Sequence, residues 1–415
     1  MTSWYLFRLF TREMRYQKKR IWLTISGIAW GTLSIILLLS FGEGLKQQMA
    51  KANKGLGVNI VIMYGGQTTK TYQGLPKGRN IRFTDEDIEL LRSKIPQITR
   101  ISGEYDLYGT SLTYNEKTIT ERVTGVLPEF EEMRTHYAAA GGRFINKTDI
   151  DQRRRVIFLG NNLKDRLFGA EEAVGKQITM NNLPFTVVGV MQEKMQMSMY
   201  GGPDENKGTV PSTTLKALEG RSHLSRIVYQ VNNLDYAATI KQQIYEILGR
   251  KYRFDPTDER ALGIWDTIEQ TQVAGNMLIG IQLFLGLIGA LTLLIASVGV
   301  ANIMYVSVKE RTQEIGIKRA LGAKRRHIKQ QFILEALMIA VVGGIIGGVV
   351  SLLIVQGLQG IPVSEGPLEL LGKPTFSWPI AISTATILGV VGLAAGFFPA
   401  RRAARVDPIE SLRYE

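Results

Sequence analysis

The sequence contains no cysteine and only three histidines among its 415 residues. The absence of cysteine excludes disulfides and thiolate metal ligands, so any part of the chain outside the cell must be held together by its own hydrophobic core. The nucleotide-binding motif G-x-x-x-x-G-K-[ST] is also missing, and with it the loop and the lysine that hold nucleotide phosphates. We therefore expect no ATP hydrolysis, no catalytic site, no cofactor and no metal site within these 415 residues.

Charged side chains are missing from four long stretches of the chain. These stretches are residues 21–42, 270–308, 336–364 and 374–400. Each is longer than the roughly 20 residues that a helix needs to cross a bilayer. A secretory signal is a second interpretation of the first stretch, because Ser40, Phe41 and Gly42 resemble a cleavage site. Its apolar run, however, exceeds the roughly 7 to 15 residues of such signals, so the sequence predicts four transmembrane helices.

Basic residues gather beside these stretches and indicate their orientation. Six lie in the first 20 residues and eight lie between 309 and 329, whereas the connection 355–378 holds only Lys373. By the positive-inside rule, both termini and the loop between spans 2 and 3 are cytoplasmic, and the region between spans 1 and 2 is outside. The net charge of +13 therefore reflects topology and attraction to membrane lipid, and we expect no nucleic-acid partner.

The predicted fold class is a membrane protein with four transmembrane α-helices and a large α+β extracytoplasmic (periplasmic) domain, carried on helical stalks between spans 1 and 2. The predicted segments are a cytoplasmic amphipathic N-terminus (1–20), span 1 (21–42), stalk helices and periplasmic core domain (43–275), span 2 (276–306), a charged cytoplasmic segment (307–329), span 3 (330–357), a short periplasmic loop (358–378), span 4 (379–400) and a cytoplasmic tail (401–415).

Local patterns predict mixed secondary structure in the exported domain. The polar stretch 44–54 is compatible with a helix that continues span 1 as a stalk. Thr84 precedes three acidic residues, which is typical of a helix start. Residues 235–250 carry apolar side chains at helical spacing, as expected of a helix packed on a sheet. Short strands rich in β-branched residues are predicted at 156–159, 185–190 and 227–231.

Two polar features near the membrane invite a chemical interpretation. Glu335 lies close to the cytoplasmic end of span 3, where a proton relay would need partners at membrane depth; we favour an interfacial carboxylate paired with a nearby cation. His327 lies among basic residues and is expected to face lipid or solvent rather than a metal.

Glycine or alanine pairs at i, i+4 predict helix contact surfaces at 343/347, 344/348, 385/389 and 392/396.

A methionine cluster lies in the exported domain. Thioether groups at this density can bind Cu(I). The alternative, which we favour, is an adaptable loop formed by Met195, Met197 and Met199, next to Met191, that contacts a partner or a substrate.

The charged segment 309–326 is the strongest candidate for a working site. If it continues span 2 as a helix, Glu314 and Lys318 form a favourable i, i+4 pair, and Gly322 can end the helix. Three apolar side chains offer contacts, namely Ile315, Ile317 and Leu321. From composition alone, such a helix could equally lie on lipid headgroups.

Four stretches of the sequence resemble one known family. VGVANIMYVSVKERTQEIGIKRALGA (298–323) is similar to the cytoplasmic signature of MacB-type ABC transporter permeases, a group that includes LolC/LolE and, more distantly, FtsX. FFPARRAARVDPIESLRYE (397–415) resembles the C-terminal signature of the same family. RRRVIFLGNNLKDRLFG (153–169) and AVGKQITMNNLPFTVVGVM (173–191) resemble its periplasmic core domain.

The resemblance implies a multi-pass inner-membrane protein that works as a dimer, with an identical or a paralogous permease. It implies a separate ABC ATPase subunit that binds ATP and Mg, because only about 20 residues precede span 1 here. A periplasmic adaptor and an outer-membrane channel are further partners that it allows. Contacts to the ATPase are implied for Glu310, Arg311, Glu314, Gly316, Arg319 and Gly322, and support at the cytoplasmic end of span 4 for Arg401, Arg402, Asp407 and Pro408.

Three classes of function compete at this stage. The first is the permease subunit of an exporter that acts on a periplasmic or membrane-derived substrate. The second is an FtsX-like transmembrane signal transducer that regulates a cell-wall hydrolase or a sensor kinase. The third is an exported enzyme on a membrane anchor, which is the weakest because no catalytic motif stands out and three further spans would be superfluous.

Overall fold

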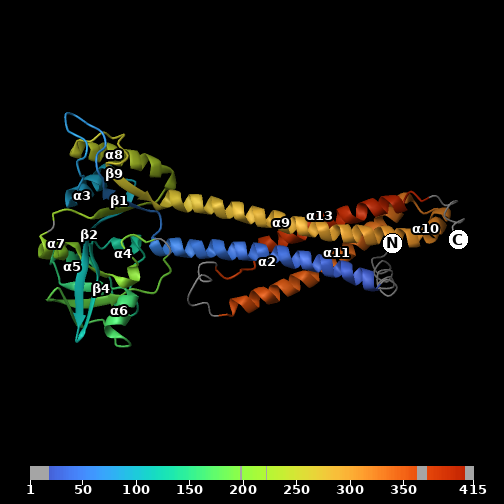
Figure 1. The fold of residues 1–415 in the computed structure, drawn as a ribbon, viewed down its shortest axis with the longest axis horizontal. Helices are drawn as coiled ribbons and strands as arrows, with labels where there is room; N and C mark the ends of the chain where they lie inside the picture. The colour runs from blue at the N-terminus through green and yellow to red at the C-terminus, as the bar shows by residue number, and fades with distance from the viewer. Residues whose placement is uncertain (1–17, 197–198, 221, 362–371, 407–415) are drawn as a thin grey trace. The chain divides into compact units, whose positions relative to one another are not determined.

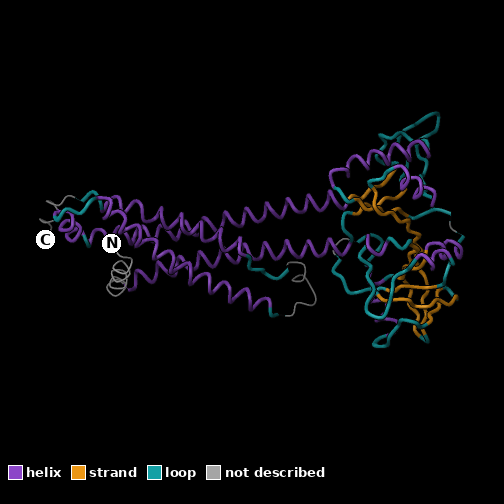
Figure 2. The backbone as a smooth tube through the Cα atoms, turned by 180° about the vertical axis from the view of Figure 1, so that it is seen from behind, coloured by secondary structure: helices purple, strands orange, loops and turns teal. Residues whose placement is uncertain are grey.

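The computed structural model describes residues 18–196, 199–220, 222–361 and 372–406. The chain divides into two compact units. The helical unit comprises Met1–Gln48 and Gly275–Glu415, and the α/β unit comprises Met49–Ala274. All strands of the described residues belong to the α/β unit, whereas the described part of the helical unit consists of helices and their connections (Figure 2).

Within the described residues, four helices are long and apolar enough to cross a membrane. They are α2 (Lys18–Leu56), α9 (Thr267–Glu310), α11 (Arg325–Gln359) and α13 (Trp378–Ala403) (Figure 1). Each predicted span lies within one of them. With 39 and 44 residues, α2 and α9 exceed the roughly 20 residues that a bilayer requires. The predicted helical continuation of span 1 through residues 44–54 is confirmed.

Small residues bring α11 close to α2. A Cβ atom added to Gly347 would lie 2.4 Å from the carbonyl oxygen of Ala29, and one added to Gly343 would lie 2.8 Å from the Ile28 side chain. No larger side chain fits without moving one of the two backbones. The predicted contact surface at 343/347 is confirmed.

Small residues also bring α13 close to α11. A Cβ atom on Gly396 would lie 2.6 Å from Cβ of Ala336, and Gly392 faces Ala340 in the same way. The predicted surface at 392/396 is therefore confirmed. Of the other two pairs, 344/348 is used at Gly344 alone: a Cβ atom there would lie 2.3 Å from the Leu388 side chain of α13, whereas nothing lies within 4 Å of a Cβ atom built on Gly348. The surface predicted at 385/389 makes no close helix contact within the described residues, because Ala385 is exposed and nothing lies within 4 Å of a Cβ atom built on Gly389.

The described residues of the α/β unit form one sheet of nine strands in the order β3-β7-β4-β6-β5-β2-β8-β1-β9. The strands are β1 (Ile60–Gly65), β2 (Ile98–Tyr114), β3 (Lys117–Val126), β4 (Val156–Leu159), β5 (Gln177–Met180), β6 (Leu183–Val190), β7 (Gly208–Pro211), β8 (Arg226–Val231) and β9 (Leu262–Asp266). All three predicted strands are present, as β4, β6 and β8.

The long strand β2 divides this sheet into two lobes. Its C-terminal part pairs with β3 and β5, and since β3 also pairs with β7, strands β2, β3, β7, β4, β6 and β5 form a closed ring. Its N-terminal part, Ile98 to Glu104, pairs with β8 and begins an open antiparallel sheet with β1 and β9. In Figure 1 the labels of β1, β9, α3 and α8 lie together in one lobe.

Helices cover the open sheet and supply much of the core. α3 (Asp85–Lys94) starts after Thr84, which forms a capping box with Asp87, as the sequence predicts. α8 (Ala237–Tyr252) starts two residues later than predicted, after the 3-10 turn η2 (Leu234–Tyr236). The remaining short elements of this unit are α4 (Phe130–Met133), α5 (Lys147–Asp151), α6 (Asn161–Phe168), η1 (Asp204–Asn206) and α7 (Ser212–Glu219).

Candidate functional site

The charged segment after α9 forms a separate short helix, α10 (Thr312–Ala320). A continuous helix from span 2 was the expectation, and the structure corrects it, because Arg311 (φ −103°, ψ 15°) leaves the helical conformation. The Thr312 hydroxyl donates to the carbonyl oxygens of Val308 (3.1 Å) and Lys309 (2.8 Å) and so satisfies the end of α9. The break gives α10 its own direction.

Gly322 ends α10 as predicted. Its φ of +93° lies in the region that favours glycine. The N–H of Gly322 donates to the carbonyl of Arg319, and the N–H of Ala323 donates to that of Lys318. These two bonds form a Schellman motif, which fixes the turn that leads into α11.

A buried ion pair fastens the start of α10 to α11. Arg311 Nη1 lies 3.4 Å from both carboxylate oxygens of Glu335, which also accepts a hydrogen bond of 3.1 Å from Gln331. The Glu335 side chain is only 4% exposed. Glu335 is thus paired with a nearby cation, as predicted.

Glu314 extends this ion pair along α10. Its carboxylate lies 3.4 Å from Nε of Arg311 and 2.7 Å from Nζ of Lys318. The predicted i, i+4 pair is therefore present. Since both Glu314 and Lys318 are partly exposed, we expect the pair itself to contribute little stability.

The two faces of α10 differ. Ile315 and Gly316 are buried, and Ile315 packs in the same core as Ile328 and Phe332 of α11. On the other face, Ile317 is 46% exposed and Leu321 is 84% exposed. Only one of the three apolar side chains singled out in the sequence is therefore used inside the helical unit. The other two lie exposed on a charged surface, one helical turn apart.

The remaining site residues of the sequence prediction lie around this helix. Glu310 is 3.8 Å from Arg20 of α2. Arg319 is half-buried. Arg401 and Arg402 occupy the exposed last turn of α13, where the Arg402 guanidinium lies 5.9 Å from the Tyr305 ring. Asp407 and Pro408 lie outside the described residues.

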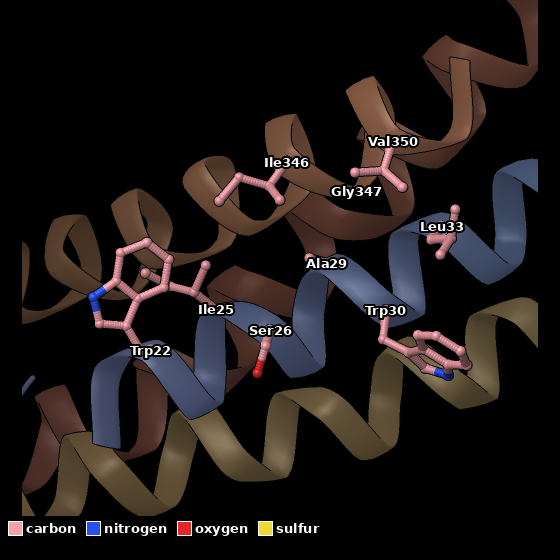
Figure 3. A pocket seen from close by; sticks show the side chains of 9 residues that line it. All are labelled: Trp22, Ile25, Ser26, Ala29, Trp30, Leu33, Ile346, Gly347 and Val350. Atoms are coloured by element: carbon pink, nitrogen blue, oxygen red, sulfur yellow. The ribbon is translucent and has the colours of Figure 1, made fainter. Parts of the chain in front are cut away.

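A shallow apolar groove of about 200 Å³ lies between α2 and α11 (Figure 3). The only polar group among its lining side chains, besides the two indole nitrogens, is the hydroxyl of Ser26, so the groove suits hydrocarbon rather than a polar ligand. Its lining residues are Trp22, Ile25, Ser26, Ala29, Trp30, Leu33, Ile346, Gly347 and Val350.

The methionine cluster is divided by the fold. Met191 is buried in a core cluster with Phe144 and Phe158. Met195 is half-buried and Met199 is 49% exposed. Met197 lies outside the described residues. The sequence spacing therefore overstated how many of these thioethers share one environment. No group of His, Asp or Glu suited to a metal ion occurs in the described part of the chain.

Sequence reasoning missed a buried ionic cluster beside this loop. Asp204 accepts hydrogen bonds of 2.9 Å on both oxygens from Arg134 and lies 2.8 Å from Lys194 and 2.7 Å from Lys207. Arg134 and Asp204 are fully buried. The four residues are spread over 74 positions, and no spacing rule links them, so the sequence offers no signal for the cluster.

The electrostatics of the cluster follow from its burial. Burial alone would raise the pKa of Asp204, but the charges of Arg134 and Lys207 outweigh it and hold this pKa well below its ordinary value. Burial lowers the pKa of Lys194 to about 8, although Asp204 opposes this shift. Burial also lowers the pKa of His136, with Lys194 adding to the effect, so His136 is neutral at pH 7.

The same cluster holds the C-terminal end of α2. Arg134 donates to the carbonyl oxygen of Leu56, and the Thr135 hydroxyl donates to those of Lys54 and Gly55 (3.1 Å each). These carbonyls have no partner within the helix, and a cation is favourable at this negative end of the helix dipole. The end of α2 is thus fixed to the α/β unit.

Comparison with known proteins identifies both parts of the chain. Residues 21–247 match the MacB-like periplasmic core domain, and residues 286–408 match the FtsX-like permease C-terminal domain. The chain is 28% identical over 407 residues to the macrolide export ATP-binding/permease protein MacB of Bdellovibrio bacteriovorus, and 30% identical over 417 residues to that of Wolinella succinogenes. The matches cover 96% and 97% of this chain, but only 60% of each relative.

Among solved structures, the periplasmic region of MacB from Actinobacillus actinomycetemcomitans matches 54% of this chain and 95% of its own, with a TM-score of 0.43 and 20% identity. The core-domain match extends over more than half of the 415 residues. The chain therefore belongs to the MacB/FtsX-like family of ABC transporter permeases, with a periplasmic core domain and membrane-spanning helices.

Proposed function

We propose that the chain is the transmembrane subunit of an ABC exporter and couples ATP hydrolysis by a separate ATPase subunit to conformational change in the α/β unit. The ATPase subunit binds ATP and Mg. The transported substrate is a periplasmic or membrane-derived molecule. The observation that carries this proposal is the two-faced helix α10, which is fastened to α11 on one side and presents exposed apolar side chains on the other.

The inner face of α10 suits the transmission of force. The Arg311–Glu335 pair and the buried Ile315 connect it to α11, so a push on α10 reaches a membrane helix directly. The outer face, with Ile317, Leu321 and the adjacent Glu314, offers an apolar centre with a charged rim, as protein interfaces do. We propose that this outer face docks on the ATPase, together with Arg319 and Gly322.

The proposed topology follows from the distribution of basic residues. Both termini and α10 lie in the cytoplasm, and the α/β unit lies in the periplasm. The close-packed glycine surfaces are compatible with a helix bundle in the inner membrane. A second permease, identical or paralogous, completes the transporter, and an adaptor and an outer-membrane channel are the further partners proposed.

The test is recovery of an ATPase with the tagged chain from its own host in mild detergent. We expect an ABC ATPase to co-purify. Replacing both Ile317 and Leu321 by serine removes the apolar contacts and should lower its recovery at least about tenfold, since loss of central apolar contacts costs roughly 2 kcal/mol or more. Val174→Ser, which changes an exposed apolar residue of the α/β unit, is the matched control and should leave recovery unchanged.

Three other outcomes would contradict or change the proposed function. Unchanged recovery of the ATPase with the double variant would remove α10 from the docking surface. Failure to recover any ATPase from the parent chain would contradict the proposal as a whole. Co-purification of a cell-wall hydrolase or a sensor kinase through the α/β unit would favour the signal-transducing function over export.

A further inference from the structure

The α/β unit contains a cavity of about 380 Å³ where two long helices meet its sheet. The last two turns of α2 form one wall, the first two turns of α9 form another, and the turn Gly57–Asn59 together with Leu234 completes the lining. This volume falls within the range of about 300 to 1,000 Å³ that is typical of small-molecule sites. From the sequence, residues 44–54 were expected only as a stalk helix, and no ligand site was predicted here.

The lining combines an apolar floor with amide groups. Leu56 and Ile268 are buried, with exposed fractions of 3% and 5%. The side-chain amides of Asn53, Asn59 and Gln272 come from three separate segments, and none of them makes a hydrogen bond within the described ranges of the chain. An amide offers both a donor and an acceptor, which is the pattern that a peptide group requires from its partner.

The walls of the cavity are held in place by hydrogen bonds to the rest of the unit. The Thr267 hydroxyl, in the first turn of α9, donates to the carbonyl oxygen of Ile60 in β1 (2.5 Å). The Thr135 hydroxyl fixes the carbonyl oxygens of Lys54 and Gly55 at the end of α2. A preformed site loses less entropy when a ligand binds than one that must first assemble.

We propose that this cavity binds an uncharged, peptide-like amphipathic ligand, whose apolar side chains contact Leu56 and Ile268 and whose amide groups pair with Asn53, Asn59 and Gln272. Lys54 is the only charged residue of the lining and disfavours cationic ligands. Because α2 and α9 both continue into the helical unit, the bound ligand links two helices that the proposed function requires to move. The coupling of binding to ATP turnover rests on the proposed function, whereas the binding itself does not.

The test uses the full chain in lipid nanodiscs with 13C-labelled methionine methyl groups. Met49 lines the cavity and reports on its occupancy, and Met49→Leu identifies its signal. The probe is N-acetyl-Leu-Ala-Leu-amide, and N-acetyl-Ser-Ala-Ser-amide is its polar counterpart. We expect the leucine peptide to shift the Met49 signal in a saturable way below about 1 mM, and the serine peptide to bind at least about tenfold more weakly. The signal of Met63, which is fully buried elsewhere in the unit, should not move.

Two leucine substitutions on neighbouring positions of α2 provide the control. Ala50 lines the cavity and Lys51 does not. Ala50→Leu should fill the cavity and weaken binding at least about tenfold, whereas Lys51→Leu should leave binding unchanged. An unshifted Met63 signal in each variant shows that the core of the unit is intact.

Either of two results would overturn the site: no saturable shift of Met49 with the leucine peptide, or a shift that Ala50→Leu leaves unaffected. Binding without a co-purifying ATPase would retain the site and contradict the proposed function. If an ATPase co-purifies but the peptide does not bind in the cavity, the proposed function would stand and the proposed site would be wrong.

Discussion

At the scale of single residues, Asp204 is a fully buried carboxylate whose charge must be balanced by its neighbours. Its carboxylate lies close to three cations, Arg134, Lys194 and Lys207. Removing a carboxylate from water costs free energy, and its attraction to these cations offsets that cost. Losing the negative charge would leave Arg134, Lys194 and Lys207 without this partner. The chain would then bury positive charge that it otherwise balances.

We expect Asp204→Asn to lower the free energy of unfolding by about 3 to 5 kcal/mol, the cost of breaking a buried ion pair from one side. Because the pKa of Asp204 is held well below the value of about 3.9 in an unfolded chain, its stabilisation is complete above that pH and is lost as the pH falls further. Denaturant unfolding of the whole protein in detergent, at neutral pH and below pH 4, measures both effects.

The matched control is Asp165→Asn, which removes an exposed carboxylate paired with Lys164. Its effect should stay within about 0.5 kcal/mol. Equal stability of the two variants at neutral pH would show that the cluster does not stabilise the fold. If the unfolding free energy of Asp204→Asn fell below pH 4 as much as that of the parent chain, protonation of Asp204 would not be the cause of the acid sensitivity.

At the scale of elements, the sequence predicts helices better than strands. The four membrane helices, the stalk continuation of α2, the N-terminus of α3 and the end of α10 at Gly322 all follow from local rules of length, capping and backbone conformation. The longest strand, β2, was not predicted, because it contains two glycines and the buried acids Glu104 and Asp106, which are unfavourable in strands. Those acids are accommodated by Arg226, more than 100 residues away.

The candidate site around α10 and the cavity of the α/β unit show the same difference. Contacts within one helical turn can be predicted from the sequence, whereas contacts between distant residues cannot. Glu314 and Lys318 pair across one helical turn, so spacing alone predicts their contact. Arg311, at the break, pairs with Glu335, 24 residues further along the chain, and the cavity of the α/β unit is lined by the end of α2 and the start of α9. Neither arrangement follows from a local pattern.

Two glycines of α11 allow a direct test of element packing. Gly347 faces the backbone of Ala29 in α2, whereas nothing lies within 4 Å of a Cβ atom built on the neighbouring Gly348. We expect Gly347→Leu to separate α2 from α11 and to lower stability by about 1 to 3 kcal/mol, as overpacking does. Gly348→Leu is the control and should leave the melting temperature of the purified protein nearly unchanged. Similar melting temperatures for both variants would contradict the close contact.

At the scale of the whole molecule, charge and hydropathy support a proposed topology with parts of the chain in the cytoplasm, in the membrane and in the periplasm. The apolar windows of the four helices have mean hydropathies between 1.9 and 2.7. Basic residues flank these apolar windows mainly at the ends that the positive-inside rule assigns to the cytoplasm. The proposed topology therefore puts α10 and the α/β unit on opposite sides of the membrane, as coupling of an internal ATPase to an external domain requires.

The absence of cysteine makes this topology directly testable, because one introduced cysteine is then the only thiol in the chain. Glu116 lies in the exposed turn between β2 and β3, and Gln313 lies on the exposed side of α10. In cells with a permeabilised outer membrane, a charged maleimide should label Glu116→Cys at once. It should label Gln313→Cys only after the inner membrane is opened, because the reagent cannot cross hydrocarbon. The opposite pattern would invert the orientation, and labelling of both positions before lysis would exclude any topology that separates them. Either result would leave α10 without access to a cytoplasmic ATPase.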